Sequence, residues 1–174
     1  MKALVCSDFG STQDLTLEQR EDLEPGAGEV LIDVKAAGVN FPDILTVEGK
    51  YQFKPELPFI PGTEVSGVVT KLGKGVATRK VGDEVVGMVQ IGGFASQVVT
   101  SEYTTFPKGS SMSYEQAAGF AVTYGTSYYA LKQRAQLQPG ETVLVLGAAG
   151  GVGIATIQIA KAMGATVIAA ASSD

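Results

Sequence analysis

A glycine-rich run near the end of the sequence carries the clearest chemistry in this chain. Residues 146–153 read Leu-Gly-Ala-Ala-Gly-Gly-Val-Gly, between an apolar run that predicts a strand and a stretch that predicts a helix. At such a junction the free N–H groups of the helix N-terminus attract an anion, and glycines let the backbone approach it. This is the context of a dinucleotide-binding turn. The residues that we expect to bind the pyrophosphate are Ala149, Gly150, Gly151, Val152 and Gly153.

The glycine pattern departs from the strict dinucleotide fingerprint at one position. Counting back from Gly153 and Gly150, the first glycine of a G-x-G-x-x-G pattern is replaced by Ala148. The alternative to a cofactor site is a glycine-rich turn that serves only close packing of the strand and the helix. The elements on both sides of the turn favour cofactor binding.

The end of the next predicted strand indicates which dinucleotide binds. A carboxylate that holds the ribose 2′-hydroxyl of NAD is expected about 20 residues beyond the glycines. Here the sequence has Ser172 and Ser173, and Asp174 comes slightly late. Small hydroxyl side chains leave room for a 2′-phosphate and can bond to it. We therefore predict NADP (NADPH) as the cofactor, with both serines at its 2′-phosphate.

Composition excludes several other kinds of site. The 174 residues contain no histidine and one cysteine, Cys6, so catalysis by a histidine-based triad is excluded and we expect no metal. The formal net charge of −5 gives no electrostatic footprint for nucleic acid or for an anionic membrane. No apolar run approaches the ~20 residues that cross a bilayer, and no targeting segment is visible. We expect a soluble, cytoplasmic protein.

The first hundred residues predict antiparallel β structure. Apolar and polar residues alternate over 29–37, with Val30, Ile32, Val34 and Ala36 expected on one face. Several such segments separated by glycine turns are typical of a small barrel or sandwich. The expected strands are 3–6, 29–37, 64–72, 84–89 and 94–100. A short helix is expected over 40–48, with Pro42 in its first turn.

The later sequence predicts helices and parallel strands. After a capping box at Ser113, helical stretches are expected, the second over 126–136. An apolar strand, a helix and a second strand form a βαβ unit. Their expected ranges are 142–146, 151–163 and 166–171. Both strands suit burial on two faces, and a two-stranded parallel sheet cannot cover its own faces. We therefore expect the sequence to be a truncated piece of a longer protein.

Three short motifs in this order resemble one enzyme superfamily. Asn-Phe-Pro-Asp at 40–43, Pro-Gly-Thr-Glu at 61–64 and the run at 148–153 are similar to the medium-chain dehydrogenase/reductase superfamily. The resemblance is greatest to its zinc-independent quinone oxidoreductase (zeta-crystallin-like) branch and extends over essentially all 174 residues. It implies an α/β plus β fold. A GroES-like β-barrel catalytic domain over 1–122, without its C-terminal return, would precede the start of an NADP-binding Rossmann doubly wound sheet over 123–174.

The resemblance also implies a reaction without zinc. In zinc-dependent members a cysteine ligand stands where this chain has Asn40, and a histidine ligand stands where it has Thr63. Without a Lewis acid, hydride transfer favours acceptors that are already electrophilic, because conjugation spreads the incoming charge. We expect NADPH-dependent reduction of a quinone or α,β-unsaturated carbonyl. An enoyl-thioester (acyl-CoA type) reductase of the same superfamily is an alternative, as is a cofactor-binding crystallin-like protein with little turnover.

Three side chains gain expected functions from the resemblance. It implies that Asn40 and Tyr51 line the pocket beside the nicotinamide and that Thr126 contacts the nicotinamide amide. The Tyr51 phenol can donate a proton to a developing oxyanion. The alternatives are an N-cap at Asn40, a covering aromatic ring at Tyr51 and a cap or packing residue at Thr126. We expect Glu64 and Asp43 to be structural. We expect a homodimer at full length and an inactive protein from the 174 residues alone.

Overall fold

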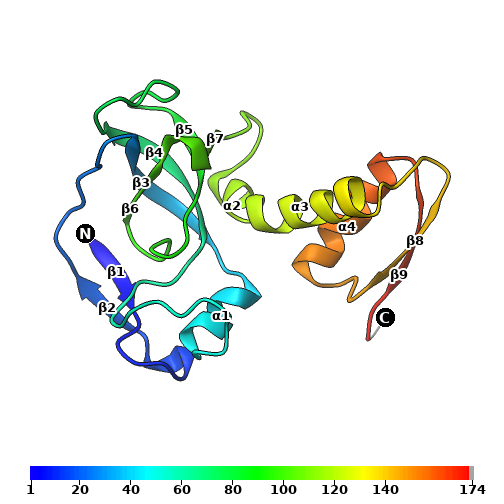
Figure 1. The fold of residues 1–174 in the computed structure, drawn as a ribbon, viewed down its shortest axis with the longest axis horizontal. Coiled ribbons are helices and arrows are strands. Elements are labelled where there is room, and N and C mark those ends of the chain that lie inside the picture. The colour runs from blue at the N-terminus through cyan, green and yellow to red at the C-terminus, as the bar shows by residue number, and fades with distance from the viewer. Residues whose placement is uncertain (173–174) are drawn as a thin grey trace. The chain divides into compact units, whose positions relative to one another are not determined.

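The computed structural model describes residues 1–172 and divides the chain into two compact units (Figure 1). The first unit is Met1–Gly119, and the second begins at Phe120. The first is built on antiparallel strands and the second on a parallel pair with helices. The predicted change of architecture along the chain is therefore confirmed.

A five-stranded antiparallel sheet forms the centre of the first unit, in the order β6-β3-β4-β5-β7. Its strands are β3 (Glu29–Gly38), β4 (Glu64–Leu72), β5 (Glu84–Met88), β6 (Gln97–Ser101) and β7 (Thr105–Pro107). β1 (Lys2–Val5) and β2 (Thr16–Gln19) form a separate antiparallel pair. The core of the sheet is almost purely valine and isoleucine: Val30, Ile32, Val65, Val69, Val85 and Val98. β-Branched side chains suit this pleated, buried surface.

β3 differs from the expected half-buried strand in one respect. Leu31, which alternation assigns to the outer face, is as deeply buried as Val30 and Ile32. The register of β3 against β4 shifts between Leu31 and Ile32 and again between Val34 and Ala36. Such irregularities re-aim side chains, so strict alternation does not hold along this strand.

Two helices in the first unit lie beside the ends of these strands. α1 (Phe41–Val47) begins after the N-cap residue Asn40 and carries a proline in its first turn, which confirms the predicted helix. α2 (Tyr114–Ala118) packs on β3 and β4, and Ser66 of β4 donates a 2.5 Å hydrogen bond to the carbonyl of Tyr114. Short 3₁₀ turns lie at Thr12–Asp14 and Glu102–Thr104.

The second unit contains the predicted βαβ arrangement. β8 (Thr142–Leu146) and β9 (Thr166–Ala170) pair in parallel, and α4 (Gly151–Ala162) connects them. α3 (Ala121–Tyr128) precedes them and continues as a π-helical segment over Tyr129–Arg134. The predicted start of this helix at residue 126 is wrong by five residues. Its true N-cap, Phe120, has helical dihedral angles and no capping side chain, so the sequence carries no start signal there.

The strands of the second unit are only partly buried. Leu144, Leu146 and Ile168 are 59%, 74% and 54% exposed, as expected for a two-stranded parallel sheet that cannot cover its own faces. The reason is the number of layers: in the described part of this unit, two strands and their helices do not cover both faces of the pair. Within residues 1–172, no helix is both long enough and apolar enough to cross a membrane.

Candidate functional site

The glycine turn joins the end of β8 to the start of α4. Gly147 has φ +64°, which favours glycine, and its carbonyl accepts a 3.0 Å bond from the N–H of Gly150. The N–H of Ala148 donates to the carbonyl of Ala170, which fixes the turn to the end of β9. Gly150 is the N-cap residue of α4 and supplies no side-chain cap. The first N–H groups of the helix are therefore offered at an open terminus.

The glycines at 150, 151 and 153 differ in how closely neighbouring atoms approach them. A Cβ on Gly153 would lie 2.3 Å from the carbonyl oxygen of Gly147, so Gly153 permits the close packing of helix and turn. A Cβ on Gly151 would lie 3.2 Å from Cγ2 of Thr123, and one on Gly150 would make an ordinary 3.4 Å contact. Packing therefore explains Gly153 but leaves Gly150 unexplained. A helix N-terminus with a bare glycine cap fits the pyrophosphate of a dinucleotide.

The remaining residues predicted to contact the cofactor lie near this turn or at one edge of the parallel pair. Ala149 and Val152 are exposed, Val152 in the first turn of α4. Because β8 and β9 run in parallel, with Leu146 opposite Ala170, their carboxyl ends meet at one edge. Ser172 is exposed just beyond β9 at this edge. Ser173 lies outside the described residues. The geometry leaves Ser172 available to a ligand on the glycine turn.

Thr126 and its neighbour Ser127 have different environments on α3. Thr126 is exposed, whereas Ser127 is fully buried. The Ser127 hydroxyl shares its proton between the carbonyls of Thr123 (2.8 Å) and Val152 (3.1 Å), and it accepts a 3.0 Å bond from Thr156. Ser127 therefore ties α3 to the first turn of α4. Sequence reasoning missed it, because a serine in a helical run has no feature that marks it as buried.

The first unit brings four polar residues together where β3, α1 and β4 meet. The amide nitrogen of Asn40 donates a 2.9 Å bond to Oε1 of Glu64, and the main-chain N–H of Asn40 donates a 2.8 Å bond to Asp43. Asp43 also accepts a 3.2 Å bond from the hydroxyl of Thr63. Since Thr63 and Glu64 are adjacent in sequence, these bonds close a ring. Asn40 is the N-cap residue of α1, so the N-cap position given above as an alternative for Asn40 is confirmed.

Both carboxylates of this ring are withdrawn from solvent. Glu64 is 1% exposed and Asp43 is 3% exposed. Burial raises the pKa of Asp43 above its ordinary value, against the opposing effect of the bonds from Asn40 and Thr63. The sequence predicted a structural function for both acids. It did not show that both hold the same residue, Asn40.

Tyr51 follows α1, and its environment is more open. Its main-chain N–H donates to the carbonyl of Leu45, and its side chain is 37% exposed.

An apolar hollow of about 370 Å³ lies beside α1 and includes Asp43 among its lining residues. The other lining residues are Leu4, Thr12, Leu15, Val39, Ile44, Val47 and Phe94.

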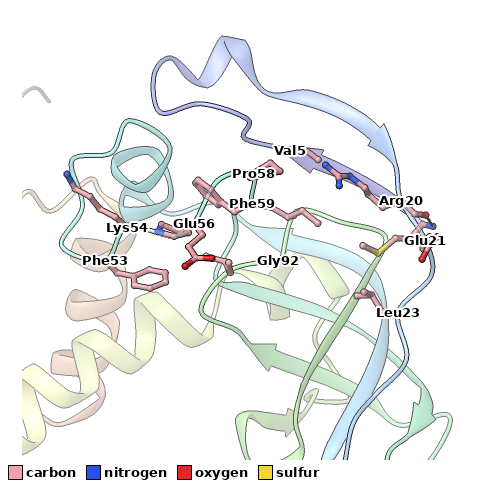
Figure 2. A pocket seen from close by; sticks show the side chains of 14 residues that line it. Val5, Arg20, Glu21, Leu23, Phe53, Lys54, Glu56, Pro58, Phe59 and Gly92 are labelled. Carbon is pink, nitrogen blue, oxygen red and sulfur yellow. Dashed lines mark hydrogen bonds between the residues drawn. The ribbon is translucent and has the colours of Figure 1, made fainter.

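A larger groove of about 820 Å³ lies elsewhere in the first unit, between the N-terminal strands and the 53–60 segment. Figure 2 shows Phe53 and Lys54 at one end and Arg20, Glu21 and Leu23 at the other, with Phe59 between them. Neither Asn40 nor Tyr51 lines this groove. Size alone therefore does not identify the predicted site.

Of the side chains that usually bind zinc, this chain has one cysteine and no histidine. No group of three His, Cys, Asp or Glu side chains within residues 1–172 is arranged to hold a metal ion. Cys6 is buried, and its thiol donates to the carbonyl of Asp8 at 3.2 Å. Burial, with a smaller effect of the Asp8 charge, raises the pKa of this thiol. A thiol with a raised pKa is a poor nucleophile and a poor ligand.

Comparison with known proteins gives one family match and several close relatives. The alcohol dehydrogenase GroES-like domain matches residues 26–127. Quinone oxidoreductase-like protein 2 of Rattus norvegicus is 44% identical over 174 residues, which cover 99% of this chain and 49% of that protein. The chain therefore spans about half the length of the curated relatives that it matches.

Solved structures agree with the sequence relatives. The human synaptic vesicle membrane protein VAT-1 homolog-like protein has a TM-score of 0.96 at 36% identity, covering 99% of this chain and 56% of that one. The quinone oxidoreductase of Thermus thermophilus, also solved in complex with NADPH, has a TM-score of 0.88 at 40% identity (99% and 54% covered). The CurK enoyl reductase has a TM-score of 0.90 at 36% identity (98% and 54% covered).

Proposed function

Because the chain belongs to the medium-chain dehydrogenase/reductase superfamily, in its quinone oxidoreductase-like branch, we propose a specific reaction for the intact protein. By the intact protein we mean the product of the complete reading frame that contains these residues. The proposed reaction transfers hydride from NADPH to a quinone or an α,β-unsaturated carbonyl without zinc. Residues 1–122 would form the catalytic domain and residues 123–174 the beginning of the cofactor domain.

The glycine turn is the observation that carries this proposal. Gly150 caps α4 without a side chain, Gly147 has a positive φ, and Ser172 follows β9 at the same edge. A pyrophosphate on this helix terminus would have backbone N–H donors and a favourable dipole. With no acid among the residues immediately after β9, the 2′-phosphate of NADPH meets no carboxylate from residues 171–173. A similar solved structure binds NADPH, which supports the same choice.

The proposal gives three side chains a part in the reaction. When bound, the nicotinamide supplies the hydride. Thr126 would bond to the carboxamide that orients it, and the Tyr51 phenol would donate to the acceptor oxygen as charge develops there. Asn40 would line the same pocket. A conjugated acceptor needs only such hydrogen bonds and positioning, because its charge is spread over several atoms.

The residue types of these 174 positions support the proposed independence from zinc. The sequence has no histidine, and its one cysteine is buried with a raised pKa. Carboxylates and carbonyls suit hard ions better than a zinc ion that polarises a carbonyl. Turnover of the intact protein should therefore survive EDTA and phenanthroline. Stoichiometric zinc with chelator-sensitive turnover would contradict this part of the proposal.

The deciding experiment measures NADPH oxidation by the intact protein with three acceptors side by side. We expect a quinone and an enone to be reduced faster than a crotonyl-type thioester. The similarity to the CurK enoyl reductase favours the thioester as the second candidate substrate. NADPH binding without turnover on any acceptor would instead support a crystallin-like protein. We also propose that the intact protein is a cytoplasmic homodimer. Its molecular mass in solution and its location in the cell would test these two points.

A further inference from the structure

We propose that Glu64 is a positioning residue for hydride transfer, because it holds the amide of Asn40 in one orientation. The inference rests on the function proposed above, in which Asn40 lines the nicotinamide pocket. Glu64 itself would touch neither cofactor nor acceptor. It would act only through the 2.9 Å hydrogen bond that it accepts from the amide nitrogen of Asn40.

The two carboxylates hold different parts of Asn40. Asp43 accepts from the main-chain N–H, which fixes the backbone at the start of α1. Glu64 accepts from the side-chain amide, which fixes the torsion of the side chain. Each carboxylate is almost completely buried, so water does not compete for either bond. Both the backbone and the side chain of Asn40 are therefore fixed before any ligand arrives.

The chemistry of the bond sets which way the amide faces. Nδ2 of Asn40 donates to Oε1 of Glu64, so the amide presents its nitrogen, not its oxygen, to Glu64. The N–H of Asp43 donates a 3.0 Å bond to the main-chain carbonyl of Asn40, so that contact does not use the Asn40 side chain. With one N–H of the amide bonded to Glu64, the second N–H can still be offered to a ligand as a hydrogen-bond donor. A donor fixed in advance suits a carbonyl oxygen that gains negative charge as hydride arrives.

The surrounding backbone makes room for this contact. Gly38 of β3 lies opposite Glu64 in the strand register. A Cβ on Gly38 would lie 2.7 Å from Cγ of Glu64 and 2.4 Å from the carbonyl oxygen of Ala118. The side chain of Glu64 therefore occupies space that any residue other than glycine at position 38 would fill. A buried acid in such a restricted space is costly unless it is bonded to donors.

The test is a double-mutant cycle on the intact protein, with kcat, the KM values for NADPH and quinone, and thermal melting measured for each variant. Glu64→Gln keeps the size of the side chain but can present either oxygen or nitrogen to Asn40, so it no longer enforces one orientation. Glu64→Leu removes the acceptor. We expect kcat to fall several-fold in the first variant and about tenfold to a hundredfold in the second, with the KM for NADPH unchanged.

The decisive comparison is made in the Asn40→Ala background. If Glu64 acts through Asn40, neither substitution at position 64 lowers kcat further once the amide is gone. If the Glu64 substitutions lower kcat by the same factor with and without the Asn40 side chain, the inference is overturned. Full activity in Glu64→Leu would also overturn it. Should Glu64→Leu fail to fold, the near-isosteric Glu64→Gln carries the same comparison.

A second buried acid of this unit supplies the matched control. Glu102 is 3% exposed and accepts three hydrogen bonds from Ala77 and Thr78, far along the chain from Asn40. Glu102→Gln should lower the melting temperature and leave kcat unchanged. A fall in kcat equal to that of Glu64→Gln would mean that loss of a buried acid, not loss of orientation, lowers the rate. Wild-type protein that reduces no acceptor would overturn the proposed function, and this inference with it.

Discussion

Gly38 lies directly opposite Glu64 in the β3–β4 pair, and the Cβ that it lacks would lie 2.5 Å from the carboxylate oxygen Oε1. The same missing atom would lie 2.4 Å from the carbonyl oxygen of Ala118, the last residue of α2, which packs on β3 and β4. One backbone position therefore gives space both to a buried acid and to a helix end. Gly38 is not among the glycines with a positive φ, so its backbone conformation does not require glycine.

We predict that Gly38→Ala destabilises the protein by about 1–3 kcal/mol, because backbone and a buried side chain must shift to admit the methyl group. The measurement is chemical denaturation followed by circular dichroism. Gly119→Ala is the matched control. It has φ −94°, and a Cβ there would lie 3.9 Å from its nearest neighbour. Equal stability of the two variants would show that the 38–64 contact relaxes without cost.

The glycine turn gives a prediction that separates charge from size. Gly151→Asp should weaken NADPH binding about a hundredfold or more, since it places a carboxylate beside a pyrophosphate. Gly151→Ala adds only a methyl group, whose carbon would lie 3.2 Å from Cγ2 of Thr123. We expect a smaller loss in this variant. Titration of NADPH fluorescence measures both, and equal losses would mean that packing against Thr123, not charge, governs the position.

Ser172 tests the choice between NADPH and NADH. The wild-type protein should bind NADPH more tightly than NADH. Ser172→Asp should lower the affinity for NADPH about tenfold and lower that for NADH much less, because a carboxylate would repel only the 2′-phosphate. Parallel fluorescence titrations give both constants, and Ser172→Ala controls for loss of the hydroxyl. If Ser172→Asp lowers the affinity for both cofactors equally, Ser172 does not contact the 2′-phosphate.

The sequence predicted the second unit better than the ring of polar residues around Asn40. β8 has the predicted bounds, and α4 and β9 differ from theirs by one residue, because hydrophobic runs and glycine turns are local signals. The bond between Asn40 and Glu64 joins residues 24 positions apart, and no local pattern encodes it. β2 was also missed, because its residues are largely exposed and its partner is β1. Contacts between distant segments decide such features.

The buried acid Asp43 predicts a pH dependence of stability. Its pKa is raised in the folded state, mainly by burial, above an ordinary value of 3.8. The folded state therefore binds this proton more tightly than the unfolded state. The stabilisation is complete below the ordinary pKa and is lost as the pH rises through the folded pKa.

Asp43→Asn removes this titration but keeps an oxygen for the Asn40 N–H. Relative to the wild type, the variant should gain stability as the pH rises from about 3 through the raised pKa, and the difference should then stay constant. Urea denaturation of both proteins between about pH 3 and 8 measures the difference. A difference that moves the other way would mean that the bonds from Asn40 and Thr63 outweigh burial and lower the pKa.

The exposed strands of the second unit lead to a prediction for residues 1–174 expressed alone. Leu144, Leu146 and Ile168 present apolar surface to solvent, and each forgoes roughly 1.5–3 kcal/mol of possible burial. Open edges of a parallel pair also promote aggregation. We expect weak hydrogen-exchange protection in β8 and β9, stronger protection in β3 and β4, and no NADPH–quinone turnover. Strong protection of β8 and β9 in a monomer that turns over would contradict this expectation. Protection in an inactive dimer would mean that a second copy covers the strands without completing the site.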